Sequence, residues 1–237
     1  MDNKAIIRAG GSALVLGAIA FMAVFAILAA RFNYPAVLDG PAETVLPALI
    51  AMGSFGRGVW IVYALLPLIW LPAGVGAYYA LRGNSPGRML LALQFALVSS
   101  ISMMLGLLRW PSVHWRLAEA YAASDPAQRF ILAAIFDGLN LYLGNYLGEF
   151  LGELSFSMFF LLSALAMLKS GLAPKWVGAV GLLTAIAGLI GMFRNVTDGV
   201  AVIAAVNNYL LPLWMILFGL WMLRVRIGYE GPPPSTA

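Results

Sequence analysis

Residues 9–30 read AGGSALVLGAIAFMAVFAILAA, a stretch without a charged side chain that is flanked by Lys4, Arg8 and Arg31. About 20 consecutive apolar residues are enough for one helix to cross the hydrocarbon core of a bilayer. The stretch is longer than the apolar core of a signal peptide, and no small-residue cleavage site precedes a soluble domain. We therefore expect it to be a membrane span that the protein retains.

Similar stretches recur along the chain. Of its 237 residues 62% are hydrophobic and 10% are charged, whereas about one quarter of the residues in a soluble domain are charged. The sequence predicts an all-α integral membrane protein with six transmembrane helices, forming one membrane domain over residues 1–237 with a disordered tail at 228–237. Besides 9–30, the predicted spans are 59–81, 89–108, 147–168, 176–193 and 200–223.

Several kinds of chemistry are excluded by residue counts. The chain has no cysteine and one histidine, His114, so thiolate chemistry, disulfides and paired-histidine metal sites are impossible. We interpret His114 as an interfacial ring. No glycine-rich phosphate loop and no GxSxG elbow occur. The 14 Lys and Arg are scattered singly along the sequence, which gives no indication of a nucleic-acid partner. We predict no cofactor and no metal.

The basic residues set the expected orientation. The loops at 82–88 and 169–175 are short, and each carries two basic residues. Short loops rich in Lys and Arg stay on the cytoplasmic side of a membrane. We therefore predict a multi-pass protein of a bacterial cell membrane with both termini in the cytoplasm. The longer segments 31–58 and 109–146 then face outward, and long loops commonly carry binding sites.

Proline and tryptophan mark features of the two outer segments. Proline at the first helical position predicts a short surface helix from Pro41 to about Met52. We expect Pro111 to end the third span, because proline lacks the N–H that a continuing helix needs. Trp60, Trp110 and Trp115 are predicted to form an aromatic belt at the outer surface of the bilayer.

Residues 136–157, FDGLNLYLGNYLGEFLGELSFS, are predicted to belong to one long helix from Ala127 to Leu168. At 1.5 Å per residue this helix measures about 63 Å, twice the thickness of a bilayer core. The fourth helix is therefore expected to extend above the membrane on the outer side. Gly144, Gly148 and Gly152 repeat every four residues on it, and such a face lets another helix pack closely.

Polar residues with the same spacing run beside these glycines, and they include two carboxylates on one helix face. Such carboxylates repel each other when both are ionised, so they need cations or a shared proton. One interpretation is structural pairing with arginines expected at the same depth: Arg57, Arg109 and Arg194. The other is a functional site, because a carboxylate inside a membrane is a candidate proton or cation carrier. The candidate ligand-binding residues are Glu149, Glu153, Asn145, Arg109, Asp137 and Asn140.

Three segments are similar to those of a known family: FNYPAVLDGPAE at 32–43, GLLRWP at 106–111 and YLGNYLGEFLGE at 142–153. They resemble patterns in uncharacterised bacterial multi-pass proteins catalogued as domain of unknown function 4386. The resemblance implies an integral membrane protein with its polar segments facing outward, and it implies no activity. In that family a histidine stands where this chain has Phe150, which weakens any analogy with a metal site.

Three functions remain compatible with the sequence. The first is binding of a small cation, a proton or an amphipathic or lipid ligand in an outward-facing polar vestibule. The second is a scaffold or accessory subunit that docks a membrane partner, or a second copy of the chain, through the glycine-lined face. The third, an outer-leaflet lipid-modifying enzyme that uses Glu149 and Glu153, is less favoured because the chain shows no nucleophile, metal-ligand set or oxyanion motif.

Overall fold

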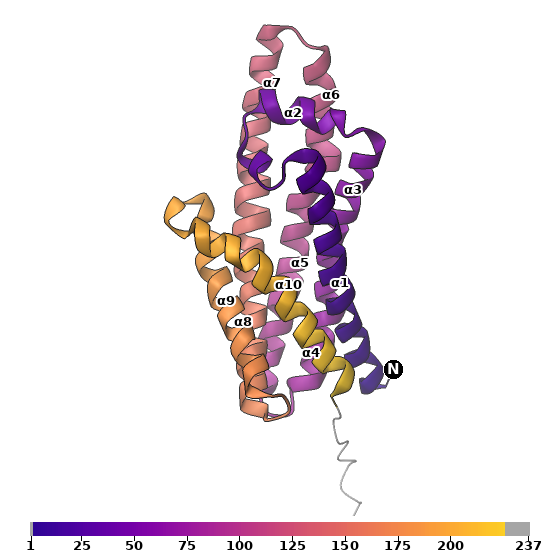
Figure 1. The fold of residues 1–237 in the computed structure, drawn as a ribbon, viewed down its shortest axis with the longest axis vertical. Helices are drawn as coiled ribbons and strands as arrows, with labels where there is room; N and C mark the ends of the chain where they lie inside the picture. The colour runs from indigo at the N-terminus through magenta and orange to yellow at the C-terminus, as the bar shows by residue number, and fades with distance from the viewer. Residues whose placement is uncertain (1, 226–237) are drawn as a thin grey trace, which may run out of the picture.

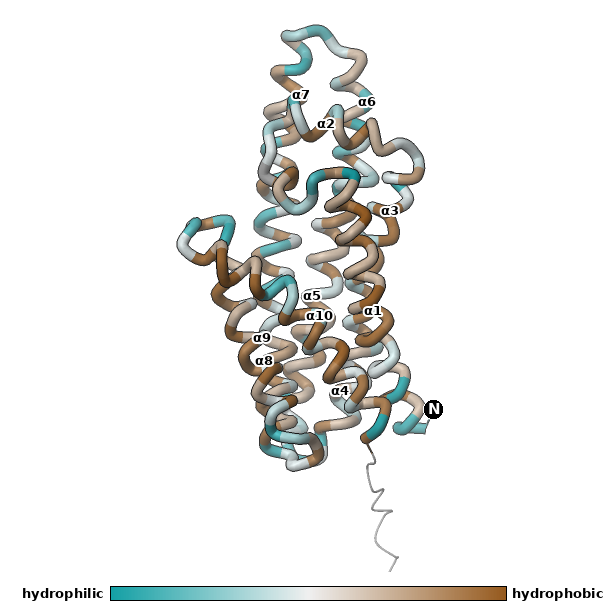
Figure 2. Tube along the Cα trace, viewed as in Figure 1, coloured by the Kyte–Doolittle hydropathy of each residue, from teal (hydrophilic) through white to brown (hydrophobic). Residues whose placement is uncertain are grey.

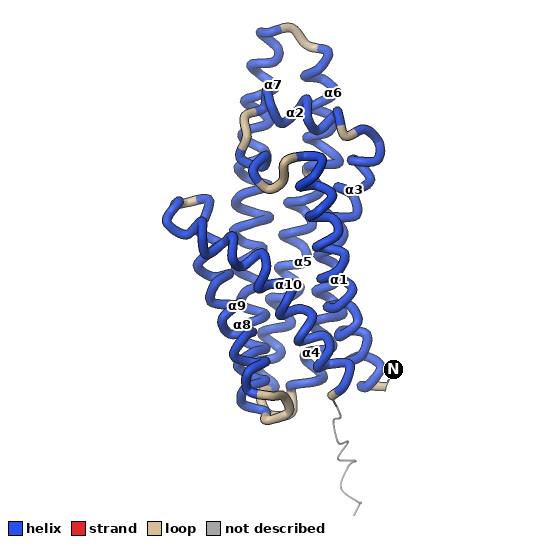
Figure 3. The backbone as a smooth tube through the Cα atoms, in the orientation of Figure 1, coloured by secondary structure: helices blue, strands red, loops and turns tan. Residues whose placement is uncertain are grey.

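The structure is a computed structural model that describes residues 2–225, a part of the chain built from helices and short connections (Figure 3). Within these described residues, six helical segments are long and apolar enough to cross a membrane: Asn3–Phe32, Gly53–Leu81, Pro86–Ala123, Pro126–Ser170, Lys175–Asn195 and Asp198–Arg224. Each of the six spans predicted from the sequence lies within one of these segments, so the predicted class is confirmed. The predicted disordered tail at 228–237 lies outside the described residues.

The α-helices are α1 (Asn3–Phe32), α2 (Ala42–Ala51), α3 (Gly53–Leu65), α4 (Trp70–Leu81), α5 (Pro86–Leu108), α6 (Trp115–Ala123), α7 (Pro126–Leu139), α8 (Gly152–Ser170), α9 (Lys175–Gly191) and α10 (Ala201–Arg224) (Figure 1). Shorter helical turns join them. They are η1 (Ala36–Asp39), η2 (Leu66–Ile69), η3 (Trp110–His114), η4 (Asn140–Leu151), η5 (Met192–Asn195) and η6 (Asp198–Val200).

The prediction that Pro111 ends the third span is wrong. The helix continues through η3, a π-helical turn, into α6, and the N–H of His114 donates to the carbonyl of Arg109 at 2.8 Å. A π-helical turn bonds residues five apart and so is wider than an α-helical turn. The wider turn accommodates a proline ring that would collide with the preceding turn of an α-helix.

Segment 109–146, which the sequence predicts to face outward, is consequently built around a helical hairpin. α6 leads away from the rest of the molecule and α7 returns beside it (Figure 1). The Asp125 side chain caps α7 by accepting from the N–H of Gln128 at 2.9 Å. α2 lies across this hairpin, in contact with both of its helices, and its bounds agree with the short helix predicted from Pro41 to about Met52.

α7, η4 and α8 follow one another without a break from Pro126 to Ser170 and form the longest helical segment of the described chain. Its 45 residues correspond to about 68 Å. η4 is π-helical, so the register of the side chains changes in the stretch that carries Asn145 and Glu149. That the first part of this helix lies above a membrane remains a prediction.

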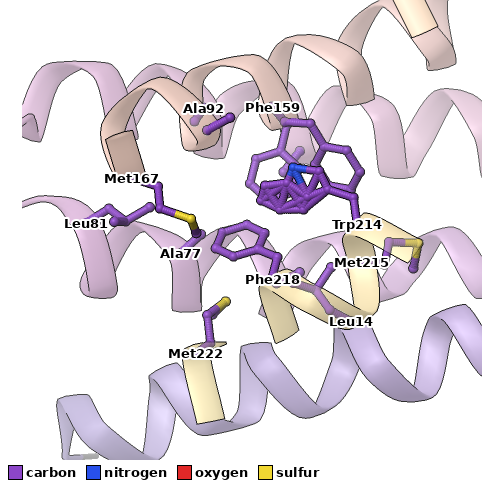
Figure 4. Packing of buried hydrophobic residues seen from close by; sticks show 14 of the residues in the cluster. Leu14, Ala77, Leu81, Ala92, Phe159, Met167, Trp214, Met215, Phe218 and Met222 are labelled. Atoms are coloured by element: carbon purple, nitrogen blue, oxygen red, sulfur yellow. The ribbon is translucent and has the colours of Figure 1, made fainter. Parts of the chain in front are cut away.

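Buried side chains form two hydrophobic cores along the molecule. The first core joins α1, α4, α5, α8, α9 and α10 around fully buried aromatic rings (Figure 4). In it, the rings of Phe160 and Trp214 stack at 5.3 Å between centroids. The second core joins the end of α1 to η1, α2, α3, η3, α6 and α7.

The second core contains the tryptophans that the sequence suggested would form an aromatic belt. Trp60 and Trp110 are fully buried and stack at 4.8 Å between ring centroids, and Trp115 is 5% exposed. His114, expected as an interfacial ring, is also fully buried, with its ring 4.7 Å from that of Phe136. Both expectations are wrong, because the α6–α7 hairpin and α2 cover the surface that these side chains would otherwise present.

Both ends of the described chain lie at one end of the molecule, opposite the α6–α7 hairpin (Figure 1). The two short connections, after α4 and after α8, lie there as well and are joined by a hydrogen bond of 3.4 Å from Asn84 Nδ2 to the carbonyl of Ser170. Hydrophilic residues gather at both ends of the molecule and at the turn between α9 and α10, whereas the helices between them are largely hydrophobic (Figure 2).

Candidate functional site

The two cores leave a cavity of about 150 Å³ between them. Trp70, Phe156 and Met215 of the first core line one side of the cavity, and Tyr63 and Trp110 of the second core line the other. A cavity of this volume accommodates a group about the size of benzene.

The crossing of α1 and α10 explains why the space exists. The two helices touch where an added Cβ on Gly11 would come within 2.8 Å of the carbonyl oxygen of Gly219. Beyond this contact they diverge (Figure 1). The cavity lies on the divergent side, lined by Phe21 of α1 and by Asn207 and Leu211 of α10.

An ionic cluster forms the polar wall of the cavity. Arg194 of η5 lies between two carboxylates, at 2.6 Å from Glu153 Oε1 and 3.2 Å from Glu149 Oε2. The three side chains are only 14 to 30% exposed. Asn195 supports the cluster, since its Nδ2 donates to Glu149 Oε2 at 2.8 Å and to the backbone carbonyl of Asn145 at 3.2 Å.

Local geometry brings these groups together from distant parts of the chain. α9 ends in the tight turn η5, which directs Arg194 and Asn195 at the junction of η4 and α8. Glu149 and Glu153 lie one helical turn apart at that junction, so a single guanidinium reaches both. Of the three arginines that the sequence offered as partners, the structure thus pairs Arg194 with the two carboxylates.

Arg109 also lines the cavity and is 4% exposed. Its Nε donates to Asn140 Oδ1 at 3.1 Å, and its Nη1 donates to the carbonyl of Gly106 at 2.6 Å. Asn140 in turn donates to the carbonyl of Leu38 at 2.9 Å. This chain of hydrogen bonds connects α5 to η4 and to the segment after α1. Because the Arg109 guanidinium is held in this way, it does not extend to lipid phosphates.

The other candidate residues lie outside the cavity lining. Asn145 contributes its backbone carbonyl to the ionic cluster, whereas Asp137 is exposed on α7. Arg57, the third arginine offered as a partner, donates from Nε to the carbonyl of Pro111 at 3.0 Å. The structure therefore assembles Glu149, Glu153 and Arg109 around one space and leaves Asp137 apart from it.

The three glycines of the long helix face α5 of the same chain. An added Cβ on Gly148 would lie 3.0 Å from the Cα of Gly106, and one on Gly152 would lie 2.6 Å from the side chain of Met103. An added Cβ on Gly144 would lie 2.4 Å from the Arg109 guanidinium. This face is occupied within the molecule, so a partner helix cannot dock on it.

Four polar side chains in the cavity lining were not among the candidate ligand-binding residues: Tyr34, Tyr63, Asn207 and Asn208. The hydroxyls of Tyr34 and Tyr63 are 3.0 Å apart, and burial raises the pKa of Tyr34 above its usual range. Asn207 is 7% exposed, and within residues 2–225 its Oδ1 has no hydrogen-bond partner. Its position in the middle of an apolar span was the signal that could have identified it.

These features define a class of protein: a polytopic α-helical membrane protein with an ionic cluster facing an interior cavity. The chain matches the family described as Domain of unknown function (DUF4386) over residues 9–225, and it belongs to that family. This confirms the resemblance seen in the sequence. Comparison with curated proteins and with solved structures gives no match.

Proposed function

We propose that this protein binds an amphipathic molecule, such as a small apolar compound with a polar end or one end of a lipid, and that a benzene-sized part of this molecule occupies the cavity between the two cores. The observation that carries the proposal is the contrast between the cavity walls. Leu66, Trp70 and Phe156 offer apolar surface, and the cluster of Glu149, Glu153 and Arg194 offers charge on the same space. Binding sites for small molecules typically combine apolar walls with a few placed polar groups.

Hydrogen bonding favours a ligand whose polar end both donates and accepts, because the lining also holds the indole N–H groups of Trp70 and Trp110, which have no partner within residues 2–225. The two carboxylates of the ionic cluster accept hydrogen bonds, and their charge is balanced by the guanidinium groups of Arg194 and Arg109 in the same lining. The unpaired Oδ1 of Asn207 is a further acceptor on the cavity wall. A buried acceptor without a partner costs about 1 to 3 kcal/mol, and a donor on the ligand would remove that cost.

The proposal includes an orientation and a place in the cell. The loops after α4 and α8 carry the short basic stretches, which supports cytoplasmic termini. The cavity, with the α6–α7 hairpin beyond it, then faces the outer side of a bacterial cell membrane. The scaffold alternative loses its support, because the glycine-lined face is covered by α5.

The test is native mass spectrometry of the protein released from mild detergent, with variants that change the cavity. Leu211→Trp fills the cavity from α10, whereas Leu213→Trp, at a side chain that is 47% exposed and outside the cavity lining, is the matched control. We expect a bound small molecule in the wild type and the Leu213→Trp variant. It should be lost in Leu211→Trp and in the Glu149→Gln, Glu153→Gln double variant.

Two results would contradict the proposal. One is a protein without any adduct when it is extracted in several detergents. The other is an adduct that persists unchanged in the Leu211→Trp variant, since a ligand in this cavity cannot coexist with an indole that fills it.

A further inference from the structure

A second candidate binding site lies at the opposite end of the molecule from the hairpin. A surface groove with a volume of about 1570 Å³ is bounded by the start of α1, the end of α4, the loop after α8 and the end of α10. Basic residues that are scattered singly along the sequence meet in its lining: Lys4, Arg8, Arg82 and Arg224.

The positive charge of this groove is not neutralised by the described part of the chain. Asp2 is the acidic residue in the lining, and its carboxylate caps α1 by accepting from the N–H of Lys4 at 3.3 Å. Within residues 2–225, none of the four basic side chains forms an ion pair. Residues 226–237 add one arginine and one glutamate, so they do not alter the balance.

The groove combines this charge with apolar surface and with an arginine that packs against an aromatic ring. Ile7, Met222 and Leu223 line it beside the basic groups. The Arg82 guanidinium lies 4.5 Å from the centre of the Tyr79 ring, which holds the arginine in place. Because the groove lies where four spans end, its polar residues are expected at the level of the lipid headgroups.

We infer that this groove binds the phosphate headgroup of an anionic phospholipid. Arginine recognises phosphate through parallel hydrogen bonds that an ammonium group does not provide, and three of the four basic residues are arginines. Basic pockets between spans on the cytoplasmic side are suited to anionic headgroups. The apolar wall provides a surface for the first part of an acyl chain. This site is separate from the ionic cavity and does not depend on its function.

The experiment measures lipid retention by native mass spectrometry after reconstitution in nanodiscs that contain equal amounts of phosphatidylglycerol and phosphatidylcholine. The groove variant carries Arg8→Gln, Arg82→Gln and Arg224→Gln. The matched control carries Arg88→Gln, Lys169→Gln and Lys175→Gln, which removes the same charge from the same end of the molecule but outside the groove. Thermal unfolding of all three proteins is recorded alongside.

We expect the wild type and the control variant to retain phosphatidylglycerol in preference to phosphatidylcholine. In the groove variant that preference should fall by at least about tenfold, because three basic groups near the anionic headgroup are removed. Its unfolding temperature should not change comparably.

Three outcomes would overturn the inference. Equal loss in both variants would mean that the lipid responds to the general charge of this end. Retention in both would place the lipid elsewhere. Displacement of the bound lipid by millimolar glycerol 1-phosphate would mean that the groove takes a soluble phosphate rather than a lipid.

Discussion

Removing the Arg194 guanidinium tests whether the ionic cluster is organised as described. Arg194→Met keeps most of the side-chain volume but leaves Glu149 and Glu153 facing each other without their cation. At an effective dielectric constant of 20, an ion pair at 4 Å contributes about 4 kcal/mol before desolvation. Removing one partner of a buried pair costs about 3 to 5 kcal/mol.

The exposure of the cluster lowers the expected cost. The three side chains are 14 to 30% exposed, and solvent screens such pairs, so we expect a loss of about 2 to 3 kcal/mol. For a chain of this length that corresponds to a decrease in Tm on the order of 5 to 10 °C. The assay is thermal unfolding in a fixed detergent, in which the fraction of the protein that stays monodisperse is measured at each temperature.

Arg116→Met is the matched control, because Arg116 pairs with Glu119 at 2.8 Å with side chains that are 79% and 41% exposed. We expect no measurable shift from it. Adding Glu149→Gln and Glu153→Gln to Arg194→Met should restore much of the lost stability, since the carboxylates no longer repel. Equal Tm values for Arg194→Met and Arg116→Met, or no recovery in the triple variant, would refute the reasoning.

Two further predictions concern a close helix contact and a pair of buried hydrogen bonds. Gly148→Ala should lower stability by about 1 to 3 kcal/mol, because the added methyl would press on the backbone of α5. The control is Gly138→Ala, where an added Cβ meets nothing within 4 Å. In the same melting assay this control should be neutral or slightly stabilising. Asn140→Ala should cost about 2 kcal/mol by removing two hydrogen bonds, and hydrogen exchange at residues 33–41 should become faster. Unchanged exchange there would contradict the role of Asn140 in holding that segment.

Hydropathy was enough to predict the class of fold and the six spans, because a long apolar run inside a membrane must be a helix that satisfies its own backbone hydrogen bonds. The same reasoning could not show how the outer segments fold. Proline usually ends a helix. At Pro111, however, the helix continues because one turn is wider. The burial of Trp60 and His114 follows from that continuation, since it brings α6 and α7 over them.

The candidate site was predictable in part. The spacing of Glu149 and Glu153 on one helix face was visible in the sequence, and so was the presence of arginines at a similar depth. Which arginine pairs with them depends on how α9 ends, and this is a matter of tertiary geometry. Asn207 was visible as a polar residue in an apolar span, but periodicity alone does not reveal which face of α10 turns toward the cavity.

The two proposed sites differ in how their charge is balanced, and this difference makes their tests independent. The cavity holds carboxylates and guanidinium groups that neutralise one another, so its preference must come from shape and from polar atoms that have no partner within residues 2–225, such as Asn207 Oδ1. The groove holds basic groups without ion pairs inside residues 2–225, so its preference must come from charge. Salt should therefore weaken lipid binding at the groove much more than ligand binding in the cavity.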